Sequence, residues 1–365
     1  MKTFHCNKCY QQVFFENVHC EKCSSMLGYQ PEHQTVSAFE PAGPDRWTSL
    51  NPVNAGMLYK QCANYSKEHV CNWMLPADSK SSLCASCQLT RIIPALSYGR
   101  NRLFWNRLET AKRRLLYTLW DLRLQPSSKA EDPLTGLAFE FLEDTPDKKV
   151  MTGHAKGLIT LNIAEADAAH RERTREQMGE PYRTLLGHFR HESGHYYFDR
   201  LIAGSPWIEP FRELFGDERR NYREAMQQHY SDGPPPDWGQ HFITSYASSH
   251  PWEDWAESWA HYLQMIDTLD TAFACGVIVK PKKANEPEVS IEARPLRVKS
   301  FADVITDWFN LTSVLNNLNR SAGMPDPYPF ALSSHSVKKL EFIHGLVLEK
   351  KTVPLVKTSV GASRS

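Results

Sequence analysis

The chain has 365 residues, with 42 basic and 42 acidic side chains, so its formal net charge is zero. This balance argues against a protein whose whole surface coats nucleic acid. The length suggests two or three domains, and the hydrophobic content of 41% is enough for a sizeable core. No run of about 18 or more apolar residues predicts a transmembrane helix.

Eight of the nine cysteines lie before residue 88, in two groups of four. Two C-x-x-C pairs in the first group are typical of a zinc ribbon, because each tight turn presents two thiolates to one tetrahedral ion. The members of this group are Cys6, Cys9, Cys20 and Cys23. The second group predicts another structural zinc. Its members are Cys62, Cys71, Cys84 and Cys87, with His69 as an alternative to Cys71.

Disulfides are the rival interpretation of these cysteines, and they would require an oxidising compartment. The first residues enter the first C-x-x-C pair directly, without the apolar segment or cleavage site of an export signal. We therefore expect reduced thiols and a cytoplasmic protein. Cys275 lies in an apolar run, and we expect it to be a buried free thiol.

Residues 88–123 are locally basic and carry apolar residues at helical spacing. This pattern predicts an amphipathic helix that joins the cysteine-rich region to the rest of the chain, with a charged outer face. Zinc ribbons include nucleic-acid binders, and the basic stripe is adjacent to one. Binding of nucleic acid or of an acidic protein partner is therefore a hypothesis for this surface.

Two further elements follow in the chain. Residues 157–163 alternate between apolar and mixed side chains, which predicts a half-buried strand. Residues 181–202 carry apolar side chains at the spacing of a buried helix. Pro181 suits the first helical position, and Gly204-Ser205-Pro206 predicts its end.

Residues 191–195 read His-Glu-Ser-Gly-His within this predicted helix. Two histidines four apart project from one face of an α-helix, so the imidazoles of His191 and His195 can hold a single metal ion. The carboxylate of Glu192 can then reach a metal-bound water. A chain with 15 histidines can match such a motif by chance, but the helical context supports it. The residues therefore predict a zinc-dependent hydrolase.

A catalytic zinc needs a third protein ligand and an open fourth position. Residues 249–263 predict a second helix, on which Glu253, Glu257 and His261 lie four apart. We expect Glu253 to be the ligand and Glu257 to accept a hydrogen bond from the outer nitrogen of a ligating histidine. The same geometry allows Glu257, His261 or His250 as the ligand. In the structural alternative, the two acids lie on the solvated face of an ordinary helix.

The combination of H-E-x-x-H with a later glutamate resembles the gluzincin metallopeptidases. Residues 253–257 read Glu-Asp-Trp-Ala-Glu, similar to the E-x-x-A-E form of several gluzincins, and this resemblance implies that Glu253 is the ligand. Residues 150–265, with the cysteine region, also resemble a family of bacterial zinc-binding metallopeptidases preceded by a zinc ribbon. Zincins usually carry an edge strand before the active-site helix, and residues 157–163 are the candidate for it. A purely structural strand is the alternative.

The expected chemistry is hydrolysis by a zinc-activated water whose pKa falls to roughly 7. Glu192 would accept the proton of this water and pass it to the leaving amine. Tyr246, seven residues before Glu253, is a candidate donor to the developing oxyanion, and a tyrosine that is merely packed is the alternative. The competing candidates are His241, His250 and Tyr230.

The sequence thus predicts an α+β protein with a zincin-like metallopeptidase core. The expected parts are residues 1–90 as a zinc-ribbon region, 91–130 as a basic connecting helix, 131–275 as the catalytic core, 276–350 as a helical C-terminal subdomain and 351–365 as a disordered tail. We expect one catalytic and two structural zinc ions, and a peptide or protein substrate. The alternatives are a zinc-ribbon interaction protein, possibly binding nucleic acid, whose third zinc is structural, and hydrolysis of a non-peptide amide.

Overall fold

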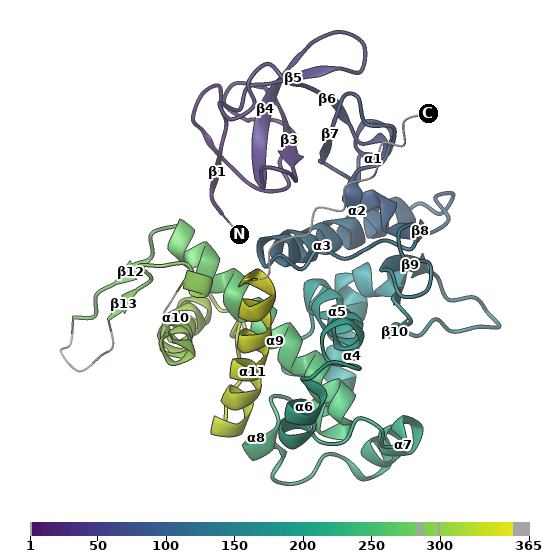
Figure 1. The fold of residues 1–365 in the computed structure, drawn as a ribbon, viewed down its shortest axis with the longest axis vertical. Helices are drawn as coiled ribbons and strands as arrows, with labels where there is room; N and C mark the ends of the chain where they lie inside the picture. Colours follow the sequence, from purple (N-terminus) through teal and green to yellow (C-terminus); the bar gives the residue numbers. More distant parts are fainter. Residues whose placement is uncertain (1, 283–285, 287, 298–299, 353–365) are drawn as a thin grey trace.

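The computed structural model describes residues 2–282, 286, 288–297 and 300–352. A β-rich N-terminal region lies at one end of the molecule, next to helix α3 (Asn101–Asp121), and the helices that follow α3 in the chain lie beyond it together with a second sheet (Figure 1). The fold is therefore mixed α and β with a helical C-terminal part, as predicted. Of the tail expected at 351–365, residues 353–365 lie outside the described part of the chain.

The N-terminal region combines a short hairpin with a five-stranded antiparallel sheet. The hairpin consists of β1 (Phe4–His5) and β2 (Gln12–Val13), and the sheet consists of β3 (Met26–Gln30), β4 (Thr35–Pro41), β5 (Trp47–Ser49), β6 (Leu58–Gln61) and β7 (Met74–Pro76) in that order. A bridge between Tyr29 in β3 and Trp73, just before β7, brings the two ends of the sheet together. Both rings are fully buried, so the sheet curls around its own core. Cys62 and Cys84 are the N-cap residues of the short helices α1 (Ala63–Ser66) and α2 (Ala85–Gln88).

Helix α3 occupies most of the segment expected to carry a charged outer face, and this expectation was wrong for two of its cations. Lys112 is buried and pairs with the buried Glu109, with 2.8 Å between Nζ and Oε2. Arg113 is also buried and donates a hydrogen bond to the carbonyl of Val70 at 2.6 Å. Helix α3 is covered by the N-terminal region as well as by the core. Lys112 and Arg113, which the sequence pattern placed in solvent, are therefore buried and have polar partners inside the protein.

The second sheet has the order β10-β11-β9-β8. Its strands are β8 (Thr90–Ile92), β9 (Ala138–Leu142), β10 (Gly153–Ala155) and β11 (Leu158–Asn162). The strand predicted at 157–163 is β11, but it is an interior strand between β9 and β10, so β10 takes the edge position proposed for it. Alternating apolar and polar side chains indicate that one face of a strand is buried. They do not indicate whether the strand pairs with one strand or with two.

Helices α5 (Leu185–Leu201) and α9 (Pro251–Ala274) pack against each other in the centre of the larger region (Figure 1). A Cβ atom added at Gly194 would lie 2.9 Å from the Ala256 Cα, so only glycine permits this approach. Helix α5 starts later than predicted, because Thr184 caps it by accepting a hydrogen bond from the Gly187 backbone N–H at 3.0 Å. Pro181 therefore lies ahead of the helix, whereas α9 begins at Pro251, within the segment 249–263 that predicted it.

Shorter elements surround this pair of helices. They are the 3₁₀ helix η1 (Ile163–Ala166), α4 (Ala168–Met178), α6 (Ile208–Phe215), α7 (Tyr222–Asp232), α8 (Trp238–His241) and the 3₁₀ helix η2 (Tyr246–Ser249). Cys275 follows the last residue of α9 and is exposed, which corrects the expectation of a buried thiol. Cys275 is the C-cap residue of α9 and precedes Gly276, so its side chain lies beyond the helix face that packs into the core.

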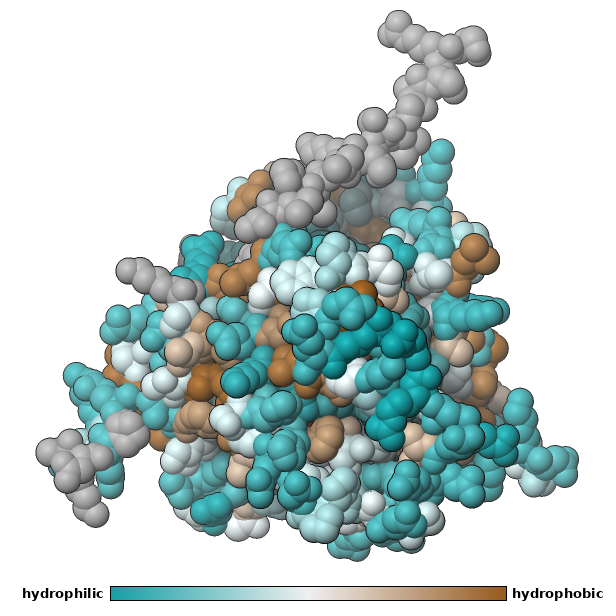
Figure 2. Space-filling view, turned by 60° about the horizontal axis from the view of Figure 1, so that its bottom comes forward, coloured by the Kyte–Doolittle hydropathy of each residue, from teal (hydrophilic) through white to brown (hydrophobic). Residues whose placement is uncertain are grey.

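The C-terminal part packs on α9. It contains β12 (Ile278–Val279), β13 (Val289–Ser290), the 3₁₀ helix η3 (Pro295–Arg297), α10 (Phe301–Ser321) and α11 (Ser334–Thr352). Arg294 forms ion pairs with Asp270 of α9 and Asp121 of α3. The distances from its guanidinium nitrogens to the carboxylate oxygens are 2.6 and 2.5 Å. Within the described residues, no helix is long and apolar enough to cross a bilayer. The face in Figure 2 is largely hydrophilic, with apolar residues in scattered patches.

Candidate metal centres

The helix pair α5 and α9 brings three potential metal ligands together. His191 and His195 lie one turn apart on α5, and their Nε2 atoms are 3.0 and 3.5 Å from the Glu253 Oε2 of α9. Ligand atoms of all three residues lie within 4.8 Å of one another. Glu253 and His195 are buried, and His191 is nearly so. The close packing at Gly194 therefore sets the distance between the histidine pair and the glutamate.

Glu257 lies one turn after Glu253 and contacts the other side of the His191 ring. Its Oε1 is 2.7 Å from His191 Nδ1, and its Oε2 accepts a hydrogen bond from the Thr244 hydroxyl at 2.8 Å. In the neutral ring, a carboxylate beside Nδ1 favours the tautomer with the proton on Nδ1, which leaves Nε2 available to bind a metal ion. Burial lowers the pKa of the His191 ring, but the two carboxylates outweigh burial and raise this pKa well above its usual range, so a metal ion would have to displace a proton from Nε2.

The donor set fits a metal ion, because it contains a buried carboxylate oxygen that faces two imidazole nitrogens without a well-directed hydrogen bond from either. Glu253 Oε2 is buried and has no hydrogen-bond partner among the described residues, although it lies between two imidazoles. Such an atom is rare in a native interior, and an ion among the three side chains would satisfy it. Two imidazole nitrogens and one carboxylate oxygen are ligands that zinc accepts.

Glu192 follows His191 and faces the same buried environment. It is 7% exposed, and its Oε2 has no hydrogen-bond partner among the described residues. Burial raises the pKa of the Glu192 carboxyl, while the neighbouring histidines oppose the shift. A carboxylate with a raised pKa binds a proton more tightly. A general base next to a metal-bound water needs this property.

Tyr246, the expected oxyanion donor, lies in η2 beside the site. Its ring centroid is 6.0 Å from that of His191, and burial raises the pKa of its hydroxyl, so the phenol stays protonated. Of its competitors, Tyr230 is 64% exposed on α7, and His241 pairs with Asp237 at 3.5 Å. Tyr246 is thus the one among these whose ring contacts a candidate ligand.

The two other histidines considered as ligands are engaged elsewhere. His250 caps α9, since its Nδ1 accepts a hydrogen bond from the Trp252 backbone N–H at 3.1 Å. Its Nε2 then carries the proton and donates to the Arg220 carbonyl at 3.1 Å. The His261 Nδ1 is 3.1 Å from the Tyr328 hydroxyl, on the side of α9 that packs on the C-terminal part. Neither residue belongs to the cluster around Glu253.

Sequence reasoning missed two residues next to the cluster. The Tyr222 hydroxyl, at the start of α7, donates a hydrogen bond to Glu253 Oε1 at 2.8 Å. His154, in the edge strand β10, lies with its ring centroid 6.2 Å from that of His195. No spacing rule links either residue to the H-E-x-x-H motif.

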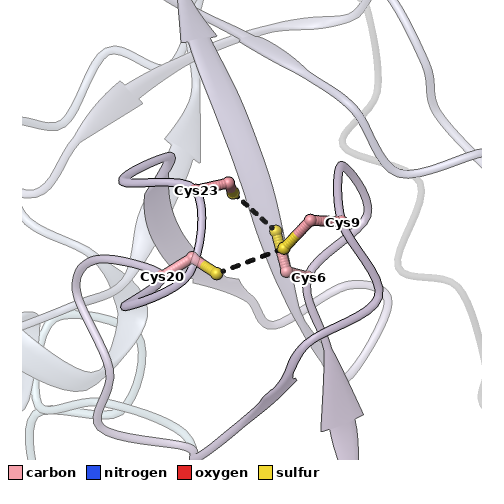
Figure 3. Close-up of side chains that lie close together, drawn as sticks. All are labelled: Cys6, Cys9, Cys20 and Cys23. Carbon is pink, nitrogen blue, oxygen red and sulfur yellow. Dashed lines mark hydrogen bonds between the residues drawn. The ribbon is translucent and has the colours of Figure 1, made fainter.

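The first cysteine quartet comes together in the N-terminal hairpin region. Figure 3 shows Cys6 and Cys9 on one loop facing Cys20 and Cys23 on another. The sulfur atoms of Cys6 and Cys23 are 3.6 Å apart, and those of Cys9 and Cys20 are 3.5 Å apart. These are distances between ligands around one ion rather than the roughly 2 Å of a disulfide. All nine cysteines are free thiols.

The second quartet is more deeply buried. Cys62, Cys71, Cys84 and Cys87 are all buried and form one potential metal site. His69 is not a member, so the structure groups Cys71 with the other three. Strand β8 starts three residues after Cys87 and belongs to the second sheet. The second cysteine site is therefore built where the N-terminal region joins the larger one.

The comparisons with known proteins also indicate zinc binding. A family model described as "Putative zinc-binding metallo-peptidase" matches residues 101–346, and one described as a zinc-ribbon domain matches residues 3–98. The chain therefore belongs to this zinc-binding metallopeptidase family and carries an N-terminal zinc ribbon, as the motifs indicated. Uncharacterized proteins of Mycobacterium bovis and Mycobacterium tuberculosis are each 41% identical over 350 residues, which cover 96% of both chains. No solved structure is significantly similar to the chain.

Proposed function

We propose that the protein is a zinc-dependent peptidase of the gluzincin type, with His191, His195 and Glu253 as ligands and Glu192 as general base. The observation that carries this proposal is the unsatisfied, buried Glu253 Oε2 between two imidazoles, with a buried carboxyl next to them. A structural zinc site has no use for that carboxyl, whereas a hydrolase depends on it.

Zinc bound to this set would lower the pKa of a coordinated water to about 7 and polarise a scissile carbonyl. Glu192 takes the proton of the attacking water and transfers it to the leaving amine. Glu257 keeps His191 in the tautomer that exposes its Nε2 lone pair. The protonated Tyr246 hydroxyl is the donor assigned to the oxyanion.

The proposed substrate is an extended peptide chain bound along β10. This strand is the edge of its sheet, and His154 within it stacks 6.2 Å from the ring of His195. An edge strand offers unpaired backbone groups that an extended segment can bind. Reduced thiols in both cysteine quartets suit a cytoplasmic location.

The deciding test compares the wild type with Glu192→Gln on a diverse peptide library and on denatured protein, with mass spectrometry as the readout. Both proteins should bind equal amounts of zinc, because Glu192 is not a ligand. We expect the wild type to cleave and the variant to lose at least ~100-fold in rate, the usual contribution of a general base.

If neither protein cleaves while both hold the zinc of the His/Glu site, a non-catalytic interaction protein becomes the better description. For that alternative, the structure offers fewer free cations than the sequence suggested. Arg102 and Arg114 of α3 pair with Glu68 and Glu16 of the N-terminal region at 2.5 and 2.6 Å. A phosphate backbone would have to compete with these ion pairs.

A further inference from the structure

Tyr222 contacts one oxygen of Glu253 and leaves the other to the histidines. Its hydroxyl donates to Oε1 at 2.8 Å, whereas Oε2 faces the Nε2 atoms of His191 and His195 at 3.0 and 3.5 Å. The two oxygens of one buried carboxylate are thus engaged differently. The structure assigns Tyr222 as a positioning residue that restricts Glu253 to one metal-binding oxygen, an inference that rests on the zinc site of the proposed function.

The position of Tyr222 is set by contacts with the start of α9 rather than by the rest of α7. His250 donates its Nε2 proton to the carbonyl of Arg220, two residues before Tyr222. Asn221 caps α7 through its side chain. The Tyr222 ring lies edge-on to the rings of His250 and Trp252, with centroids 5.3 and 5.8 Å away. These contacts hold the phenol next to Glu253.

A nearby glycine allows the chain to pass close to α9. Gly216 ends α6 with φ +100°, and a Cβ atom there would meet the ring of Pro251 at 3.2 Å. The segment from Gly216 to Tyr222 thus runs against the first turn of α9, on which Glu253 lies. Tyr222 is nevertheless 41% exposed, so part of its side chain faces solvent.

The consequence concerns the fourth coordination position. A carboxylate that binds through one oxygen leaves a four-coordinate zinc with room for water, whereas one that binds through both oxygens fills more of the coordination sphere. The bond from Tyr222 occupies Oε1 and opposes the second mode. Loss of the hydroxyl should let Glu253 turn toward the ion with both oxygens, and it should also remove a partner that orients the ligand.

The test uses the full chain with zinc kept in both cysteine sites and only the His/Glu site exchanged by a mild chelator. Three proteins are compared: wild type, Tyr222→Phe, and Tyr230→Phe, which removes an exposed hydroxyl from the same helix. The readouts are zinc affinity by chelator competition and the visible spectrum after Co²⁺ is added to the emptied site. The spectrum of His195→Ala is subtracted as background.

We expect Tyr222→Phe to bind zinc about 10–100-fold more weakly, the usual effect of losing a group that orients a ligand. Its cobalt bands should weaken, because they lose intensity as the coordination number rises. Tyr230→Phe should match the wild type in both. Unchanged affinity and an unchanged spectrum in Tyr222→Phe would overturn the inference, and so would equal changes in Tyr230→Phe.

The fold of each variant is checked by thermal unfolding with the site emptied, where the lost hydroxyl can act only on stability. A Tyr222→Phe protein that unfolds at the wild-type temperature but shows the metal effects supports a positioning role. The zinc affinity and the cobalt spectrum do not depend on catalysis. A wild type that cleaves no peptide would remove the proposed function, while the cobalt spectra would still decide the role of Tyr222.

Discussion

At the scale of single residues, the glycine inside the H-E-x-x-H motif is decisive for packing. A Cβ atom at Gly194 would lie 2.9 Å from Ala256 Cα and 3.2 Å from the Trp259 ring, and the first of these is backbone that cannot turn away. Because backbone must shift to relieve the clash, α5 and α9 would be forced apart. The separation of the histidines from Glu253 depends on this approach.

We therefore predict that Gly194→Ala destabilises the protein by about 1–3 kcal/mol, the usual cost of overpacking, and weakens zinc binding at the His/Glu site. The matched control is Gly345→Ala in α11, where an added Cβ would meet nothing within 4 Å. That variant should be neutral or gain up to about 1 kcal/mol. Urea unfolding measures both, and equal stability of the two variants would contradict the packing argument.

A second residue-scale prediction concerns acid. Burial lowers the pKa of His344 from 6.5 to about 4, and its Nδ1 lies 3.1 Å from the Tyr262 hydroxyl, which donates to the neutral ring. The unfolded state therefore binds more protons between pH 6.5 and 4. The stability contributed by neutral His344 is complete above pH 6.5 and is lost as the pH falls through this window.

His344→Asn keeps an acceptor for Tyr262 but does not titrate. Between neutral pH and pH 5, the wild type should lose about 2 kcal/mol more free energy of unfolding than this variant. Urea unfolding at the two pH values gives the difference, and protonation of metal ligands affects both proteins alike. Parallel losses would show that His344 is not held neutral in the folded state.

At the scale of elements, a buried ion pair joins α11 to α9. Lys339 Nζ lies 2.6 Å from Asp254 Oδ2, and it also donates to the His241 carbonyl at 2.7 Å. Both side chains are buried, and Asp254 is next to Glu253 in the first turn of α9. The desolvated carboxyl has a pKa raised to about 7, mainly by burial and in spite of Lys339.

Lys339→Met should cost about 3–5 kcal/mol, because it leaves a buried carboxyl without its partner. Adding Asp254→Asn removes the stranded charge and should restore at least half of this loss. Urea unfolding of the two single variants and the double variant completes the cycle. Strictly additive losses would mean that the two side chains do not act as a pair.

At the scale of the whole molecule, the described residues contain three groups able to hold a metal ion, and two of them lie in the N-terminal region. We predict three zinc ions per chain by elemental analysis. His195→Ala and Cys6→Ser should each lower the count by one. A wild-type count of one or none would contradict this architecture.

The two cysteine sites should differ in their effect on the rest of the protein. The second quartet is wholly buried, and β8 of the second sheet starts three residues after Cys87, whereas Cys9 and Cys23 of the first quartet are partly exposed. Loss of the second zinc should therefore lower the unfolding temperature of the entire chain. We expect Cys87→Ser to have a larger effect than Cys9→Ser, measured by calorimetry. Equal effects would show that the join between the regions does not depend on the second site.

The parts of the fold that the sequence predicted are those with a local signature. C-x-x-C spacing, the H-E-x-x-H motif and the 3.6-residue period of α9 depend on neighbours a few residues apart, so the order of residues alone is enough to identify them. The five-stranded sheet of the N-terminal region was not predicted. Its strands are held by pairing across the sheet and by the bridge from Tyr29 to Trp73, and neither has a local pattern.

The sequence by itself determined which functional groups this protein contains: two cysteine quartets, a histidine pair with an adjacent glutamate, and a later helix with two carboxylates. Only the tertiary structure decided which groups meet. It placed Glu253 near both imidazoles and Glu257 near one, and it brought in Tyr222 from 31 residues before Glu253. It also buried Lys112 and Arg113 of α3 and left β10 rather than β11 at the edge of the second sheet. Ligand spacing along one helix is fixed by backbone geometry, whereas contacts between distant elements depend on how those elements pack.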